Sequence, residues 1–237
     1  MLKIDLHTHT IFSGHAFNTM YEMAHEASEK KLTHLGITDH TPYKKRFSDD
    51  IFKMYERIPP YLFGVRIVPG IEIDIIDTNG TIELPEKYRK NLKIFSAGFH
   101  IERGVPNTID RNTKAMISML DNPLINVITH PYLSNYPVDI KKVAEHACSK
   151  EKLLELNNSS FRYKNKYDDD SIKRAKKMIE VFQNHGMKMI IGSDAHIAFE
   201  LGEDSNLMAR KEELGFRDND IINNYPKEVE KYFGLDE

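Results

Sequence analysis

Residues 3–9 read KIDLHTH, a short apolar strand pattern that ends in two histidines one residue apart. Side chains at positions i and i+2 of a strand point to the same face, so His7 and His9 share a direction. The stretch GSDAH, near the other end of the chain, repeats this spacing with Asp194 and His196. In a closed barrel the last strand approaches the first, and the four side chains would then converge from both sides of the closure.

Short apolar runs alternate with helix-like patterns along the whole sequence. Strands are expected at 3–9, 33–40, 66–76, 93–100, 126–131, 153–159 and 188–196. Helices are expected at 110–121, 138–149 and 168–185, with one or two more within 206–235. Thr19 and Glu22 have the spacing of a capping box, which predicts the start of a further helix. The Asn-Gly pair in 77–80 is typical of a hairpin turn.

Strands that alternate with helices are typical of a parallel sheet with helical crossovers. No Gly/Ser linker, low-complexity run or repeat divides the 237 residues, so we expect a single domain over 1–237. Seven strand–helix units in one α/β domain favour a closed or nearly closed barrel. A doubly wound open sheet is the alternative that a count of strands leaves open.

The composition is that of an ordinary globular protein, with 40% hydrophobic and 29% charged residues. The formal net charge of −3 gives no push toward nucleic acid or a membrane surface. The single cysteine, Cys148, excludes a disulfide framework and a site with several thiolate ligands, and we expect it to be buried or half-buried. No apolar run approaches the roughly 20 residues that span a bilayer, and no signal-peptide pattern opens the chain. These features predict a cytoplasmic protein without a membrane partner.

Polar side chains collect where the expected strands end. They are His7, His9, His40, Glu72, His100, His130, Asp194 and His196, with His15 in the loop that leaves the first strand. In parallel α/β folds the carboxyl ends of the strands share one rim, where active sites are built. The set is therefore expected to form one site. The remaining histidines, His25, His34, His146 and His185, lie in or beside expected helices and are interpreted as structural.

Imidazole and carboxylate ligands without thiolates suit zinc, manganese or iron. Nine candidates are too many for one ion, so they predict a cluster of two or three metals with Glu72 as a bridging ligand. Closely spaced metals lower the pKa of a bridging water and stabilise both oxygens of an in-line displacement. That chemistry points first to phosphoester hydrolysis and next to amide or ester hydrolysis. No nucleophilic Ser or Cys motif, dinucleotide loop or P-loop competes with it.

The runs DLHTHT, ITDH, GIE, GFH, THP and GSDAH occur in this order. In them the chain closely resembles the PHP (polymerase and histidinol phosphatase) family, and most closely its small stand-alone YcdX-type phosphatases. The resemblance implies a distorted, TIM-like (βα)7 barrel that holds three divalent metals, commonly zinc, with manganese or iron as the other options. It implies three ligand sets, the first being His7, His9, Glu72 and Asp194, the second Glu72, His100 and His130, and the third His15, His40 and His196.

Further residues are candidates for substrate binding and for support of the ligands. Lys44, Lys45 and Arg46, in the loop after the second strand, could meet a substrate phosphate, as could Asn158, Ser159 and Arg162 after the sixth. Asp39, beside His40, could orient a ligand. Glu72, as the bridging ligand that positions a metal-bound hydroxide, and Asp194 are the catalytic candidates.

Three functions are open at this point. The first is a phosphatase for small phosphomonoesters that uses a metal-activated hydroxide at a trinuclear site. The second is a phosphodiesterase or 5′-end exonuclease on nucleotides or short nucleic acid, which would need a basic channel. The basic segment 87–93 precedes the fourth strand and is expected at the opposite rim. The third is a non-catalytic, metal-stabilised binding module. The physiological substrate, the native metal, the group that protonates the leaving oxygen and the oligomeric state are left open.

Overall fold

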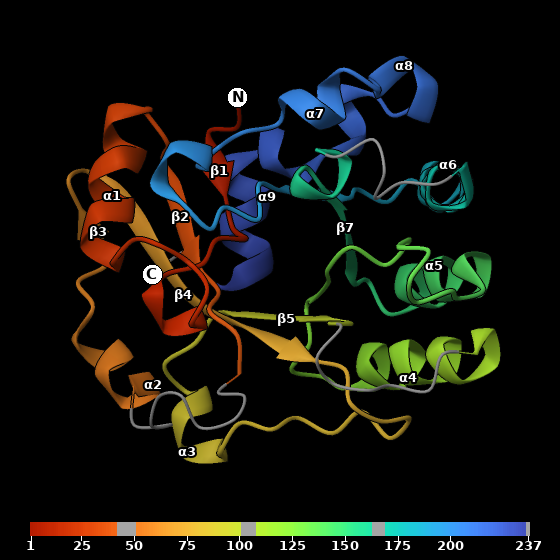
Figure 1. Ribbon diagram of the computed structural model, residues 1–237, viewed down its shortest axis with the longest axis horizontal. Helices are drawn as coiled ribbons and strands as arrows, with labels where there is room; N and C mark the ends of the chain where they lie inside the picture. The colour runs from red at the N-terminus through yellow and green to blue at the C-terminus, as the bar shows by residue number, and fades with distance from the viewer. Residues whose placement is uncertain (42–50, 101–107, 163–168, 236–237) are drawn as a thin grey trace.

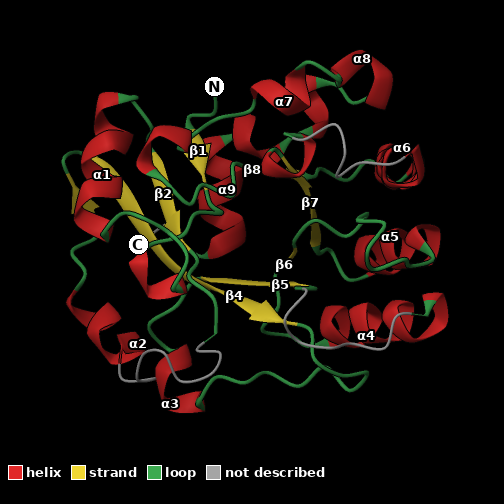
Figure 2. Ribbon diagram, in the orientation of Figure 1, coloured by secondary structure: helices red, strands yellow, loops and turns green. Residues whose placement is uncertain are grey.

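The computed structural model describes residues 1–41, 51–100, 108–162 and 169–235. Its parallel strands form a nearly closed barrel with helices on the outside (Figures 1 and 2). In spatial order the strands are β1 (Ile4–Asp5), β2 (His34–Ile37), β4 (Val65–Asp74), β5 (Ile94–Gly98), β6 (Val127–Ile128), β7 (Leu153–Asn157) and β8 (Ile190–Gly192). All seven expected strands are therefore present, each shorter than its apolar pattern.

The barrel closes just beyond the ends of β1 and β8. The His9 N–H donates to the Ala195 carbonyl at 2.9 Å, and the Asp194 N–H donates to the His7 carbonyl at 3.0 Å. Thr8 and Ala195 form a parallel bridge between these two hydrogen bonds. This closure confirms the α/β barrel in a single domain, and the open doubly wound sheet does not fit it.

The described helices lie outside the strands, around the barrel and at its amino-terminal end. They are α1 (Met20–Glu29), α2 (Ile51–Met54), α3 (Glu86–Arg89), α4 (Ile109–Asp121), α5 (Ile140–Ser149), α6 (Asp169–Asn184), α7 (Ser205–Met208), α8 (Lys211–Leu214) and α9 (Pro226–Phe233). The capping box expected at α1 is formed, since Thr19 Oγ1 accepts from the Glu22 N–H and Glu22 accepts from the Thr19 N–H at 2.7 Å. Cys148 is buried in α5. Among the described residues, no helix is both long and apolar enough to cross a membrane.

The strand β3 (Tyr61–Leu62), which is antiparallel to its neighbour, was not predicted. It pairs with β4 through a turn at Phe63 and Gly64, which both have positive φ. The hairpin expected at 77–80 is wrong, because the chain there goes on to α3. The turn itself exists, with the Asp77 carboxylate accepting from the Asn79 N–H at 2.8 Å. It packs on α4 instead of joining two strands.

Two apolar layers hold the fold together. One lies between the strands and the outer helices. The other fills the amino-terminal end of the barrel, where Ile4, Val68 and Ile190 meet Val229 and Phe233 of α9. The helix thus plugs that end. The opposite, carboxyl-terminal end holds the polar side chains of the centre.

A candidate metal centre at the carboxyl-terminal rim

Glu72 stands at the middle of the rim, near the end of the long strand β4. Its side chain is 1% exposed. Its Oε2 lies 3.3 Å from His7 Nε2, 3.4 Å from His9 Nε2 and 3.4 Å from His40 Nδ1. The first and second strands therefore supply three ring nitrogens to a single carboxylate oxygen.

The other oxygen of Glu72 faces a different set of histidines. Its Oε1 lies 3.4 Å from His100 Nε2 and 3.3 Å from His130 Nε2. Thr129 Oγ1 donates to the same oxygen at 2.7 Å, which holds the carboxylate plane in place. The two oxygens of one side chain thus point at two separate groups of ring nitrogens.

Asp194 closes the set from the last strand. Its Oδ1 lies 3.2 Å from His9 Nε2, 3.6 Å from His7 Nε2 and 3.5 Å from His196 Nδ1. Asp194 has φ 58° and His130 has φ 33°, a left-handed conformation that costs free energy in residues other than glycine. Two donors of the centre are therefore held in strained backbone, which is typical of functional sites.

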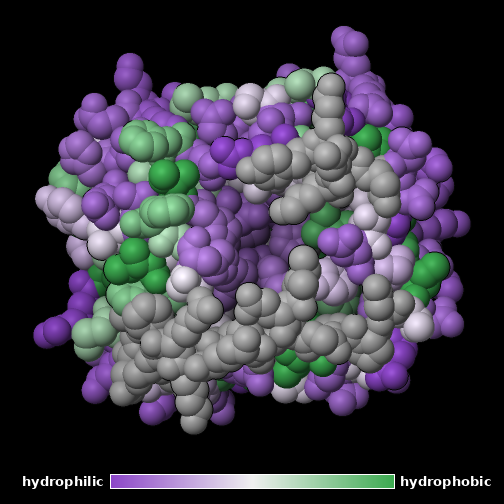
Figure 3. All heavy atoms as spheres, in the orientation of Figure 1, coloured by the Kyte–Doolittle hydropathy of each residue, from purple (hydrophilic) through white to green (hydrophobic). Residues whose placement is uncertain are grey.

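The outermost part of the centre is a stack of imidazole rings. The His9 ring centroid lies 4.6 Å from that of His40 and 4.3 Å from that of His196. The exposed His15 adds its ring at 5.2 Å from His40 and 4.7 Å from His196. Figure 3 shows a hydrophilic hollow in the middle of this face of the molecule.

Among the described residues, four groups of side chains have donor atoms close enough together to share an ion. They are His7, His9 and Asp194; Glu72, His100 and His130; His9, His40 and His196; and His40, Asp74 and His100. The structure therefore brings together every donor of the first two predicted ligand sets. In the third set His9 takes the place predicted for His15, whose ring lies beside the group.

The donor chemistry of these residues fits divalent metals. His40 Nδ1 and His130 Nδ1 are buried and have no hydrogen-bond partner among the described residues, a state that usually costs free energy. Burial, together with the neighbouring His9, lowers the pKa of His40 well below its usual value and that of His196 to about 4. These rings are neutral near pH 7. Their lone pairs suit zinc, manganese or iron.

His100 behaves differently from these neutral rings. Burial opposes a charge on it, but Glu72 and Asp74 outweigh the burial and raise its pKa to about 10. In the metal-free protein this ring carries a proton that a bound metal would replace. A proton and a metal ion thus compete for the His100 ring.

A second layer of acceptors fixes the rings, and sequence reasoning missed most of it. Glu155 accepts from His7 Nδ1 at 2.6 Å, and Asp74 accepts from His100 Nδ1 at 2.7 Å. Two signals could have found them. Asp74 follows Glu72 at i+2 on the same strand, and Glu155 is the only charged residue in the apolar stretch LLELN of β7.

Asp39, predicted as a supporting residue, acts on a different histidine from the one beside it. Its Oδ1 accepts from Ser13 Oγ at 2.6 Å, and that hydroxyl lies 2.9 Å from His9 Nδ1. Its two oxygens also accept from the N–H and the hydroxyl of Thr10, both at 2.7 Å. The structure therefore places Asp39 behind His9, with Ser13 between them.

The predicted substrate-binding residues divide into three cases. Lys44, Lys45 and Arg46 lie outside the described residues. Ser159 and Arg162 line an open cleft of about 550 Å³ beside the centre, where Arg162 forms an ion pair with Glu200. Asn158 also borders it, but its Oδ1 accepts from the Leu207 N–H at 3.1 Å.

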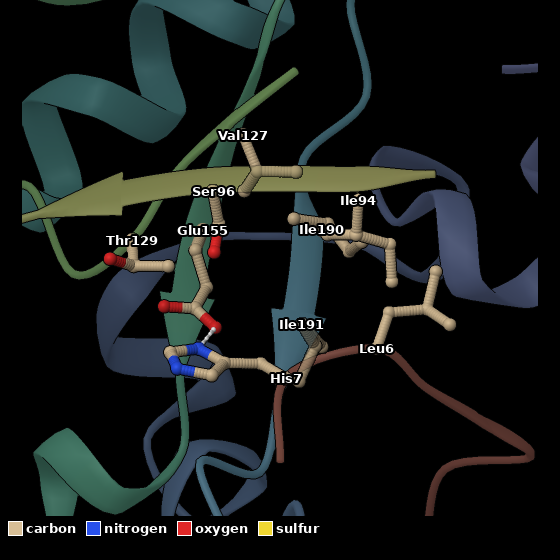
Figure 4. A pocket seen from close by; sticks show the side chains of 10 residues that line it. Leu6, His7, Ile94, Ser96, Val127, Thr129, Glu155, Ile190 and Ile191 are labelled. Atoms are coloured by element: carbon tan, nitrogen blue, oxygen red, sulfur yellow. Dashed lines mark hydrogen bonds and ion pairs between the residues drawn. The ribbon is translucent and has the colours of Figure 1, made fainter. Parts of the chain in front are cut away.

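A much smaller cavity lies inside the barrel, directly beneath the centre. Its volume of about 10 Å³ is at the lower limit for one water molecule. Figure 4 shows the contact between Glu155 and His7 on its wall, with Thr129 and Ser96 nearby and apolar side chains on the other side. The centre thus rests on a polar layer above the apolar filling of the barrel.

Comparison with known proteins gives a consistent set of similarities. The family model described as the PHP domain matches residues 5–221. A probable phosphatase of Acetivibrio thermocellus is 35% identical over 235 residues, covering 97% of this chain and 94% of the relative. A second, from Caldanaerobacter subterraneus, is 38% identical over 237 residues, covering 98% and 91%.

Two solved structures share the fold at low sequence identity. A histidinol phosphate phosphatase of Lactococcus lactis, complexed with zinc, L-histidinol and phosphate, has a TM-score of 0.57 at 16% identity and covers 90% of this chain and 94% of its own. A putative histidinol phosphatase of Listeria monocytogenes has a TM-score of 0.61 at 16% identity, with coverages of 86% and 98%.

Proposed function

Because this chain belongs to the PHP domain family, we propose that it hydrolyses small phosphomonoesters at a centre of three divalent metals, with zinc as the expected metal. At the coarser level it is a metal-dependent phosphatase, as family membership and the full-length relatives support. The observation that carries the finer proposal is the placement of Glu72. Its Oε2 is within 3.4 Å of three ring nitrogens and its Oε1 within 3.4 Å of two others.

The residues proposed to hold the metals follow from this arrangement. We assign His7, His9, Glu72 and Asp194 to the first ion, Glu72, His100 and His130 to the second, and His15, His40 and His196 to the third, with His9 close enough to contribute to the third group. Divalent ions bound there would polarise the phosphoryl oxygens and lower the pKa of a coordinated water.

Asp194 is proposed to lie next to the water that is consumed. Its side chain is 19% exposed, against 1% for Glu72, so it is the more accessible of the two carboxylates. Asn157 Nδ2 lies 3.3 Å from Asp194 Oδ2, while Asp194 Oδ1 faces His9. Asp194 is thereby oriented with one oxygen toward the ring nitrogens.

The cleft beside the centre favours a substrate with a small leaving group. Ser193 and Ile197, which flank Asp194 and His196 in the chain, form part of its wall. Its described charged lining residues are Arg162, Glu200 and Glu203, so acidic groups outnumber basic ones. The described lining offers one basic side chain, Arg162, which is paired with Glu200, whereas phosphate backbones are bound mainly by Lys and Arg. The phosphomonoesterase is therefore favoured over the exonuclease.

The test uses the zinc-loaded protein with an aryl phosphate and a panel of small phosphomonoesters, beside a 5′-phosphorylated oligonucleotide. We expect hydrolysis of the small esters, and a fall in kcat/KM of at least about 100-fold in Glu72→Gln and in His130→Ala. Asp121→Asn is the matched control, because it removes a carboxylate that pairs with a histidine, His146, on the surface. Faster cleavage of the oligonucleotide would favour the exonuclease, and zinc binding without any hydrolysis would favour a binding module.

A further inference from the structure

We propose that Glu155 is a positioning residue that couples the first and second metal groups, so that neither is held at full affinity without it. The inference rests on the ligand assignment proposed above. Glu155 is buried in β7, and its two oxygens contact His7 Nδ1 and the His130 N–H. It acts through two residues that belong to different groups.

The first contact fixes a ring of the first group. Glu155 Oε1 accepts from His7 Nδ1 at 2.6 Å, which places a ring proton on Nδ1 and turns Nε2 toward Glu72 Oε2, 3.3 Å away. A carboxylate behind a histidine ligand fixes the ring orientation and raises its basicity. The His7 ring is therefore held in a fixed orientation before any ion arrives.

The second contact fixes the backbone of the second group. Glu155 Oε2 accepts from the His130 N–H at 3.1 Å. His130 has φ 33°, a strained conformation that persists only where its surroundings hold it. That conformation directs the ring so that Nε2 comes to 3.3 Å from Glu72 Oε1. The Glu155 carboxylate thus holds the His7 ring with one oxygen and the strained His130 peptide with the other.

The surroundings of Glu155 leave it no alternative position. Asn157 Nδ2 donates to Oε2 at 3.2 Å, so both oxygens are engaged. On the side of β8, a Cβ added at Gly192 would lie only 2.1 Å from Oε1 and 2.7 Å from His7 Cβ. The glycine permits this close approach, and the carboxylate therefore ties together the residues that follow β1 and β6 from within β7.

Asp74 provides the contrast that makes the coupling testable. It accepts from His100 Nδ1 at 2.7 Å, and His100 lies near Glu72 Oε1 only. Removal of Asp74 should therefore affect the second group, whereas removal of Glu155 should affect the first and the second. A merely structural carboxylate would show no such difference.

The experiment measures zinc binding by equilibrium dialysis against a chelator-buffered series, with the metal content read by mass spectrometry. We expect Glu155→Gln to weaken two zinc equivalents by about 10–100-fold each, because an amide has one acceptor oxygen for the three donors that contact the Glu155 carboxylate. Asp74→Asn should weaken the second-group zinc and leave the first-group zinc unchanged. Asp121→Asn should match the wild type.

Loss of affinity for only one zinc in Glu155→Gln, or wild-type affinity for both, would overturn the proposal. If Glu155→Gln does not fold, a measurement on the wild-type protein tests the proposal instead. Histidine ¹H–¹⁵N spectra of the zinc-loaded protein should show His7 protonated on Nδ1, and the opposite tautomer would overturn the proposal. None of these readouts needs substrate, so a failure of the phosphatase proposal would appear separately, as intact zinc binding without hydrolysis.

Discussion

At the level of single residues, the centre depends on which nitrogen each histidine presents. His7 and His100 donate through Nδ1 to buried carboxylates. In His7 and His100 this leaves Nε2 toward Glu72, at 3.3 and 3.4 Å. In His15 and His196, Nδ1 lies 3.0 Å from a backbone carbonyl, of Ser13 and of Asp194 respectively. The outer rings have neutral acceptors, so they are the less basic ligands.

Ser13 offers a mild way to test this second layer. Ser13→Ala removes the hydroxyl that stands between Asp39 Oδ1 and His9 Nδ1. We expect zinc affinity and kcat/KM to fall about 10-fold, with a loss of about 1 kcal/mol in the free energy of unfolding. Metal analysis and urea unfolding measure the two effects. Ser149→Ala, which removes a hydroxyl bonded to a surface carbonyl, is the control. Equal values for both variants would mean that Ser13 does not support His9.

At the level of elements, the sequence predicted the strands and the residues at their ends. The apolar runs located β1, β2 and β4 to β8, and parallel topology then implied a shared rim. The two-residue strand β3 carries no alternation that could predict it. Glu155 and Asp74 were missed for a different reason, since a polar residue in a strand does not reveal which distant side chain it will meet.

The close packing of β8 on its neighbours leads to a prediction for Gly192. Gly192→Ala would bring a methyl group to 2.1 Å from Glu155 Oε1. We expect a loss of about 3 kcal/mol or more in unfolding free energy, together with weakened zinc binding. Gly64→Ala is the comparison, since it has positive φ but open space around it, and about 1–2 kcal/mol is expected from the backbone alone. Unfolding curves and metal content distinguish the two. A similar small loss in both variants would argue against the tight contact.

At the level of the whole molecule, the two ends of the barrel have different tasks. The apolar end is plugged by α9, where Tyr232 Oη donates to the Asn126 carbonyl at 2.7 Å and the ring of Phe233 is buried. The polar end carries the centre. Stability and metal binding are therefore separable by position along the barrel axis.

This separation predicts the effect of a change in the plug. Phe233→Ala should lower the free energy of unfolding by about 3–5 kcal/mol, because it removes a large buried side chain. Zinc affinity at 25 °C should stay within about twofold of the wild type while the protein remains folded. Phe233→Leu keeps most of the apolar volume and should cost much less. Loss of zinc in proportion to the loss of stability would mean that the two ends are coupled.

Metal binding should in turn stabilise the whole barrel, because the donors come from both sides of its closure. His7 and Asp194 meet where β1 approaches β8, and Glu72 joins them from β4. A metal ion that binds only the folded chain adds about 2.7 kcal/mol to the free energy of unfolding when its free concentration is 100 times its dissociation constant. Chelator-treated protein should therefore melt at a lower temperature and regain its stability when zinc is added back. In Glu72→Gln the gain should be much smaller, because the donor that faces both groups is lost. An unchanged melting temperature on adding zinc to the wild type would show that the centre does not hold the strands together.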